Sequence, residues 1–397
     1  MSNWYRTKIV RLFAYLFLIW ISVLFYELTM YRTLFGTGAN SLVTMEEYSN
    51  FTKILGLFFF IFSFFLFVNE FLLLCKQKLI VYFSFLILSY GTIATIHTHL
   101  PFEYLHPFIS LICFYLISSK KIISPHIISI WIIIIILSLS YPYIIAVGKI
   151  QQTAASNNME LTTNGSYIFS ALLPMVLLLK RSFLKNLMIL VVLALVSYSL
   201  KRTAFLGCVI SIIFYIICSN NKKISQTIIR LLFLIIISIT ILIPIIQDYV
   251  PNLYNRFVGI SDDKGSGRTV IWSILINNLF NRDIVTLIFG TGFRSTVDIT
   301  RVASAHNEFL ELLIDFGLLY FVIYSYIHYY LFRISLKLIN KGFQPQLLSS
   351  AVVFFVVAMF SHWVDFGFLS GLTAFWGYYL GLLNRKNLYY ENRYFDI

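Results

Sequence analysis

A histidine opens one of the hydrophobic segments of this chain and is followed by an asparagine and three acids. His306 can act as a general base, because the protonation state of a histidine changes near neutral pH. Asn307 can cap a helix that starts here. Glu308, Glu311 and Asp315 follow at spacings that place them on one face of that helix. A role in stabilising the start of the helix explains Glu308 as well as a catalytic role does. Asp315 lies about 13 Å beyond His306 along the helix, and an acid at that depth requires a cavity or a partner.

Cationic residues lead up to this histidine. The polar segment before it contains Arg256, Lys264, Arg268, Arg282, Arg294 and Arg301. The planar guanidinium group binds two phosphate oxygens at once, so several arginines suit a diphosphate. Arg268 follows Gly265-Ser266-Gly267, whose glycines let the backbone approach a ligand closely. We expect Arg268, with Arg294 and Arg301 near His306, to bind an anion.

A second basic pair, Lys201 and Arg202, lies between two hydrophobic runs. These side chains could extend to lipid phosphates at the membrane surface, or they could converge with the cations of the later segment on one ligand. Arg256 and Arg282 are explained equally well as loop charges paired with nearby aspartates. The basic pair is therefore the stronger candidate for a second part of the anion site.

The composition is that of a membrane protein. The chain has 397 residues, of which 59% are hydrophobic and only 12% charged, whereas soluble globular chains carry about 25% charged residues. The net charge of +13 is better explained by cytoplasmic loops and an anion site than by nucleic acid. We find no glycine-rich phosphate loop, no nucleotide-sugar motif of the DxD type and no serine-hydrolase elbow. We therefore expect neither a metal nor a cofactor, and no nucleic-acid partner.

We predict an all-α fold, a single polytopic membrane domain over residues 1–397 with about twelve transmembrane helices. The predicted spans are 10–30, 52–74, 79–97, 102–118, 123–146, 166–179, 186–200, 203–218, 230–246, 308–332, 346–364 and 367–384. Basic residues follow every second span, so that side, with both termini, is cytoplasmic. Residues 247–307 then form one long loop on the other side. Within it, 270–275 is an amphipathic stretch that we place at the membrane surface, with Trp272 at headgroup level.

Four motifs occur in an order that resembles a known family. They are Lys201-Arg202-Thr203-Ala204-Phe205-Leu206-Gly207, Gly265-Ser266-Gly267-Arg268 followed by Trp272, Gly290-Thr291-Gly292-Phe293, and His306-Asn307 followed by Gly317. Together they resemble the O-antigen polymerase and O-antigen ligase superfamily, integral inner-membrane glycosyltransferases of cell-surface polysaccharide pathways. The motifs cover roughly 160–320, and the topology extends the resemblance to the whole chain.

The resemblance implies a glycan donor linked to undecaprenyl diphosphate, used at the periplasmic face of the bacterial inner membrane without a sugar nucleotide. It implies that Arg202 and Arg268 hold the diphosphate and that His306 acts on the acceptor hydroxyl group. Further residues are expected to bind the diphosphate or to support the site: Lys201, Arg294 and Arg301 for the diphosphate, and Asn307, Glu308 and Asp315 for support.

Within the superfamily we expect an O-antigen polymerase, whose donor and acceptor are both lipid-linked. The many cations on the outer side are compatible with two diphosphates. The ligase pattern often continues with a second glycine three residues after the first, where this chain has Tyr320. A ligase that transfers the glycan to lipid A–core stays an alternative, as does a lipid-linked oligosaccharide flippase. Membrane lipids and a chain-length regulator protein of the same pathway are the other expected partners.

The predicted orientation can be tested with single cysteines at Ser225 and Ser261. In intact spheroplasts, an impermeant thiol reagent should label the cysteine at position 261 and leave the one at 225 unlabelled, because only the first lies outside. The reverse pattern would contradict the orientation.

Overall fold

The computed structural model is helical throughout the part of the chain that it describes. It describes residues 3–35, 50–66, 105–156, 164–199, 201–219, 268–292, 295–301, 305–341, 345–361 and 367–389, with isolated residues elsewhere. Within these ranges, three helical stretches are long and apolar enough to cross a membrane: Lys8–Met30, Pro125–Gln152 and Arg202–Ser219. The helical fold class and the membrane character are thus supported, whereas the number of twelve spans and the outer location of 247–307 stay predictions.

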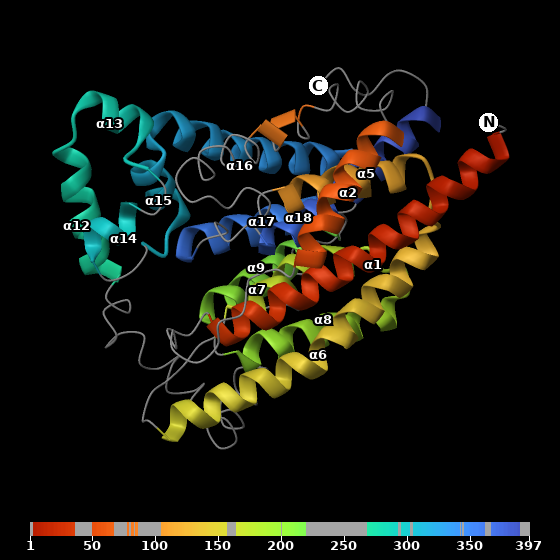
Figure 1. The fold of residues 1–397 in the computed structure, drawn as a ribbon, viewed down its shortest axis with the longest axis horizontal. Helices are drawn as coiled ribbons and strands as arrows, with labels where there is room; N and C mark the ends of the chain where they lie inside the picture. The colour runs from red at the N-terminus through yellow and green to blue at the C-terminus, as the bar shows by residue number, and fades with distance from the viewer. Residues whose placement is uncertain are drawn as a thin grey trace. The chain divides into compact units, whose positions relative to one another are not determined.

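The described helices group into two compact units (Figure 1). The first unit holds α1 (Asn3–Phe35), α2 (Asn50–Leu66), α5 (Leu105–Ser119), nearly all of α6 (Pro125–Ser156), α7 (Ser166–Val176), α8 (Ser182–Tyr198) and α18 (Gly367–Tyr389). The second unit holds α9 (Arg202–Ser219), α12 (Arg268–Phe280), α13 (Ile284–Phe289), α14 (Ser295–Thr300), α15 (Glu308–Asp315), α16 (Gly317–Asn340) and α17 (Gln346–Phe360). Most predicted spans with described residues contain one helix, with ends displaced by a few residues. The predicted span 230–246 lies outside the described residues.

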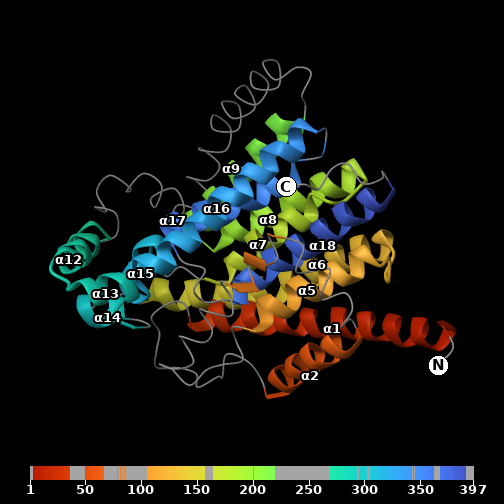
Figure 2. The ribbon, with the colours of Figure 1, turned by 90° about the horizontal axis from the view of Figure 1, so that it is seen from above.

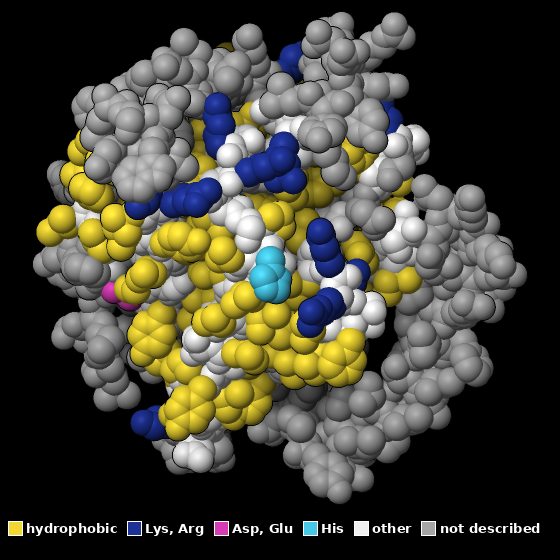
Figure 3. Space-filling view, turned by 90° about the vertical axis from the view of Figure 1, so that its right-hand side faces the viewer, with side chains coloured by type: hydrophobic (Ala, Val, Ile, Leu, Met, Phe, Trp, Pro, Cys, Tyr) yellow, Lys and Arg dark blue, Asp and Glu magenta, His cyan; other side chains and the backbone are white. Residues whose placement is uncertain are grey.

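Two helices of the first unit, α5 and α18, pack with their backbones close together. A Cβ added at Gly377 would lie 2.1 Å from the carbonyl oxygen of Leu111, and one at Gly381 would lie 2.6 Å from that of Tyr115. These pairs show that the two helices run parallel, so the basic residues after α5 and near the end of α18 lie at the same end. Figure 3 draws the described Lys and Arg side chains among hydrophobic ones, with few acidic side chains in view.

In the second unit, α9 and α17 pack as antiparallel neighbours. The Thr203 hydroxyl group donates to the carbonyl oxygen of Phe360 at 3.4 Å, while Ser211 donates to that of Ser349 at 3.0 Å. Between these contacts, Gly207 lies beside Val357. The start of α9, with its basic pair, is therefore held at the end of α17. Figure 2 shows α12, α13 and α14 gathered beyond one end of α16.

The predicted span 308–332 is broken into two helices, because the chain turns at Phe316 and Gly317. Gly317 has a φ of +79° and faces Gly290, which has a φ of +78°. A Cβ at Gly317 would lie 2.2 Å from the carbonyl oxygen of Ile288, and one at Gly290 would lie 2.1 Å from that of Asp315. Only glycine fits both the conformation and this close approach. The prediction of one continuous helix was wrong at this point.

Hydrogen bonds extend the contact between the two glycines. The backbone N–H groups of Thr291 and Gly292 donate to the carbonyl oxygens of Ile314 and Asp315, at 3.1 and 2.9 Å. The Arg282 guanidinium group donates to the carbonyl oxygen of Ile314 at 2.7 Å. Burial lowers the pKa of Arg282, while the nearby carboxylates of Asp315 and Asp283 favour its charged form. This junction joins α13 to the start of α16.

Replacing Gly317 with alanine should destabilise the protein strongly. The left-handed conformation costs about 1–2 kcal/mol for a residue with a Cβ, and forcing the Cβ against the backbone adds about 1–3 kcal/mol. We expect a clear fall in the midpoint of thermal unfolding of the purified protein in detergent. Gly207→Ala is the matched control, because its Cβ would make ordinary van der Waals contacts with the side chains of Val357 and Val356, at 3.5 Å or more. Equal stability of the two variants would contradict this account of the junction.

Candidate functional site

The last turn of α17 connects two of the predicted site motifs. The final carbonyl groups of a helix lack partners within the helix and need others. The Asn307 amide group donates to the carbonyl oxygen of Met359 at 3.1 Å, and Thr203 donates to that of the adjacent residue, Phe360. Asn307 also caps α15, because its side-chain oxygen accepts from the backbone N–H of Leu310 at 3.0 Å. The starts of α9 and α15 are therefore held at the same end of α17.

Lys201 and Arg202 lie at the start of α9, beside this end of α17. Both side chains are half-buried. The backbone carbonyl of Lys201 accepts from the N–H of Phe205 at 3.2 Å, so the helix begins directly at the basic pair. The negative end of the α17 dipole favours cations nearby, whereas the positive start of α9 disfavours them, so helix dipoles alone do not account for the pair.

The third motif reaches the same region through α12. The Trp272 indole N–H donates to the carbonyl oxygen of Ala305, the residue before His306, at 2.7 Å. A buried apolar cluster joins α12 to the loop before α15 and to the end of α15; its members are Ile271, Leu275, Ala305 and Ile314. Trp272 is therefore a packing residue that joins α12 to the loop of His306, and its location at headgroup level stays a prediction.

Arg268 is the first residue of α12 and lies one turn before Trp272. Residues four apart lie on the same side of a helix, so Arg268 lies on the side of α12 that contacts the loop of His306. Its side chain is half-buried. The tryptophan thus holds the start of α12, with Arg268, in position relative to the loop of His306.

His306 has an unusual backbone conformation, with a φ of +50°. Few residues other than glycine adopt this region, although histidine is among the more tolerant, and such residues cluster at functional sites. The backbone N–H of His306 donates to the buried carboxylate of Glu311 at 3.2 Å. The half-buried imidazole ring is thus carried on a turn held from both sides, by Glu311 and by the Ala305–Trp272 hydrogen bond.

The acids of α15 all face the interior, as their spacing predicted, but they have different surroundings. Glu308, Glu311 and Asp315 are each at most 7% exposed. Glu308 interacts electrostatically with the phenol group of Tyr324 in α16. Asp315 accepts from the Ser295 hydroxyl group at 2.8 Å and from the backbone N–H of Thr296 at 3.1 Å. Asp315 therefore caps α14. These hydrogen bonds supply the partner expected from the sequence for an acid at this position along the helix.

The other predicted cations are Arg301 and Arg294, which the hydrogen bonds above do not connect to the turn of His306. Arg301 ends α14 with a φ of +57° and an exposed side chain, and Arg294 lies outside the described residues. Within the described ranges, no group of three or more histidine, cysteine or acidic side chains could hold a metal ion. The roles assigned to the site residues in catalysis and diphosphate binding stay predictions.

Two contributors to this region have no clear signal in the sequence. The spacing of Glu311 indicates only its place on the helix face, yet its carboxylate holds the turn of His306. Arg282 is explained by the sequence as a solvated loop charge, yet it binds a backbone carbonyl oxygen and the side chains of Asn278 and Thr291. Its bond to Ile314 joins segments far apart in sequence, which spacing along one helix does not reveal.

The comparison with protein families gives one match. The model of the family described as O-antigen ligase matches residues 187–325. No curated protein matches the chain. The matched residues contain the start of α9, all of α12 and the loop and helix of His306, which are the elements that the hydrogen bonds above connect. This part of the chain is therefore related to the O-antigen ligase family, and the predicted resemblance to the O-antigen polymerase and ligase superfamily is confirmed.

Proposed function

We propose that this protein is an O-antigen polymerase of the bacterial inner membrane. It would join oligosaccharide repeat units carried on undecaprenyl diphosphate, at the periplasmic face. The observation that carries the proposal is the convergence of three motifs: Thr203 and Asn307 bind adjacent carbonyl groups of α17, and Trp272 binds the carbonyl group next to His306. The family match supports a reaction on lipid-linked glycans and gives the flippase alternative no support.

Arg202 and Arg268 would bind the diphosphate of the donor. During the reaction the bond between the anomeric carbon and the diphosphate breaks, and the leaving undecaprenyl diphosphate gains negative charge. Arginines already in place stabilise this charge more than they stabilise the bound donor, which lowers the barrier. Their half-buried positions strengthen the attraction relative to that in open water. Lys201, Arg294 and Arg301 are the further candidates for contacts with phosphate.

His306 would accept the proton of the acceptor hydroxyl group. The hydroxyl oxygen attacks the anomeric carbon, the glycosidic bond forms, and the proton moves to the imidazole ring. The fixed turn at His306 limits the orientations open to the ring, which favours a reaction geometry set in advance. Glu308 lies two residues on and would stabilise the imidazolium cation that forms, while Asn307 keeps the turn attached to α17.

The matching family is described as O-antigen ligase, which keeps the ligase as a second candidate. Both activities need the same donor and the same cations, and they differ in the acceptor. At the position where the ligase pattern often has its second glycine, the buried Tyr320 packs against Phe316, with ring centroids 5.2 Å apart. An aromatic ring there fills space beside the break between α15 and α16, and this difference favours the polymerase.

Replacing a proposed diphosphate-binding arginine with lysine tests whether positive charge alone is enough or whether the planar shape of the guanidinium group is needed. We expect Arg268→Lys to lose nearly as much activity as Arg268→Ala, because an ammonium group cannot make the two parallel bonds of a guanidinium group. Removing such a contact should lower activity by about a hundredfold or more, the effect of losing a few kcal/mol. The assay is polymerisation of a purified lipid-linked repeat unit. Arg333→Lys, at a position on α16 away from the three motifs, is the control, and full activity in Arg268→Lys would contradict the proposed geometry.

The products formed in cells decide between polymerase and ligase. Deletion of a polymerase should leave lipopolysaccharide capped with one repeat unit, whereas loss of a ligase should leave bare core. His306→Asn should reproduce the deletion phenotype with normal protein levels, because asparagine tolerates a positive φ but cannot act as the base. A bare-core pattern would assign the ligase activity, and a normal ladder in His306→Asn would exclude the histidine from the mechanism.

A further inference from the structure

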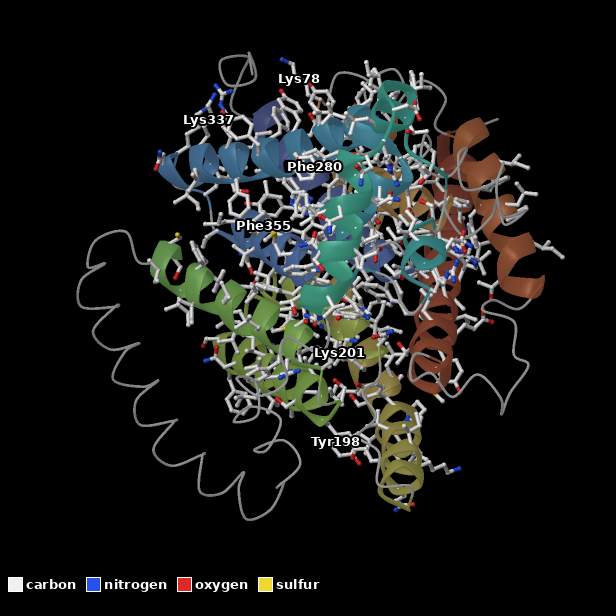
Figure 4. All side chains as sticks on the ribbon, turned by 90° about the vertical axis from the view of Figure 1, so that its left-hand side faces the viewer. Lys78, Tyr198, Lys201, Phe280, Lys337 and Phe355 are labelled. Carbon is white, nitrogen blue, oxygen red and sulfur yellow. The ribbon has the colours of Figure 1, made fainter. Side chains whose placement is uncertain are left out.

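An exposed apolar surface lies where α12 meets α13. Its members are Phe280, Ile284, Val285 and Phe289, which are 81%, 75%, 65% and 64% exposed. We call these four residues the corner patch. Figure 4 labels Phe280 near the end of α12 that leads into α13. Large hydrophobic side chains in contiguous exposed positions are typical of a surface that contacts another apolar phase.

Charged groups near the corner patch are engaged in local structure. Residues 269–281 contain no acidic or basic side chain. Arg282 is directed to the carbonyl oxygen of Ile314. Asp283 caps α13, accepting from the backbone N–H groups of Val285 and Thr286 at 2.9 and 3.0 Å. A helix that faces water would carry charged residues on its outer side. The end of α12 and the helix α13 instead expose aromatic and branched aliphatic side chains.

The corner patch continues the outer surface of α16. The helix α13 packs against α16, and the first turns of α16 expose Leu318, Leu319 and Val322 at 44%, 57% and 54%. Figure 1 shows that α12 runs across the direction of α16 and not along it. If α16 crosses the bilayer, α12 lies in the plane of the membrane surface, the orientation of interfacial helices.

We propose that the corner patch is immersed in the hydrocarbon of the lipid leaflet that borders the site. The occupant is bilayer lipid, because the patch is uncharged and adjoins the exposed apolar first turns of α16, in a chain that has helices long and apolar enough to cross a membrane. The lipid contact would set the height of α12 relative to the membrane. Arg268, at the other end of α12, would then lie near the phosphate level of the leaflet. This location is independent of which reaction the protein performs.

Spin labels can measure the position of the corner patch directly. The full-length chain, with its four native cysteines replaced by alanine, is labelled at Phe280→Cys or Val285→Cys and placed in nanodiscs of phosphatidylethanolamine and phosphatidylglycerol. Collision rates with oxygen, which partitions into lipid, are compared with those for a water-soluble nickel chelate. Leu319→Cys is the lipid-facing control and Asp298→Cys, an exposed position of α14, the water-facing control.

The labels at 280 and 285 should resemble the label at 319, with oxygen collisions exceeding nickel collisions. Ratios like those of the label at 298 would place the patch in water and overturn the proposal. Immobilised spectra with few collisions of either kind would show that protein covers the patch, and would overturn it as well. Because all the labelled positions are exposed, loss of folding is not expected to obscure the result.

Discussion

The close contact between Gly290 and Gly317 is the constraint on which the site depends. Two backbones approach here more closely than any side chain would allow, and each glycine uses a positive φ to do so. The contact ends α13 against the start of α16 and separates α15 from α16. Without the break at Gly317, α15 would continue the axis of α16, and its first residues could not meet the end of α17.

A second constraint is the need of backbone groups at helix ends for partners. Where burial keeps water away, side chains or neighbouring segments must supply those partners. The last turn of α17 is served by Asn307 and Thr203, the start of α14 by Asp315, and the turn of His306 by Glu311. Residues that are candidates for chemistry therefore also hold helix ends. Loss of activity in a variant of Asn307, Glu311 or Asp315 does not by itself indicate a catalytic role.

The sequence predicted the helices well and the tertiary contacts poorly. Hydrophobic runs located most of the described helices, because a span must be long and apolar whatever its neighbours are. The break at Gly317 was missed, since glycine is tolerated within transmembrane helices and its role here depends on Gly290, far away in sequence. The partner of Trp272 was missed for the same reason: nothing in the sequence indicates that its indole N–H donates to the carbonyl oxygen of Ala305, 33 residues away.

The candidate site was partly predictable because its chemistry needs particular residue types. Cations outside the predicted cytoplasmic loops single out Arg202 and Arg268 in the sequence alone. What the spacing could not give was the path between them, which runs through backbone carbonyl groups of Phe360, Met359 and Ala305. Every residue has a carbonyl group, so the sequence does not indicate which of them accept these hydrogen bonds. The cations and the histidine can therefore be identified in the sequence, whereas their arrangement in space cannot. If the donor is lipid-linked, as proposed, its diphosphate would approach along the membrane surface, and a binding site fixed through helix ends at that surface would be suited to meet it.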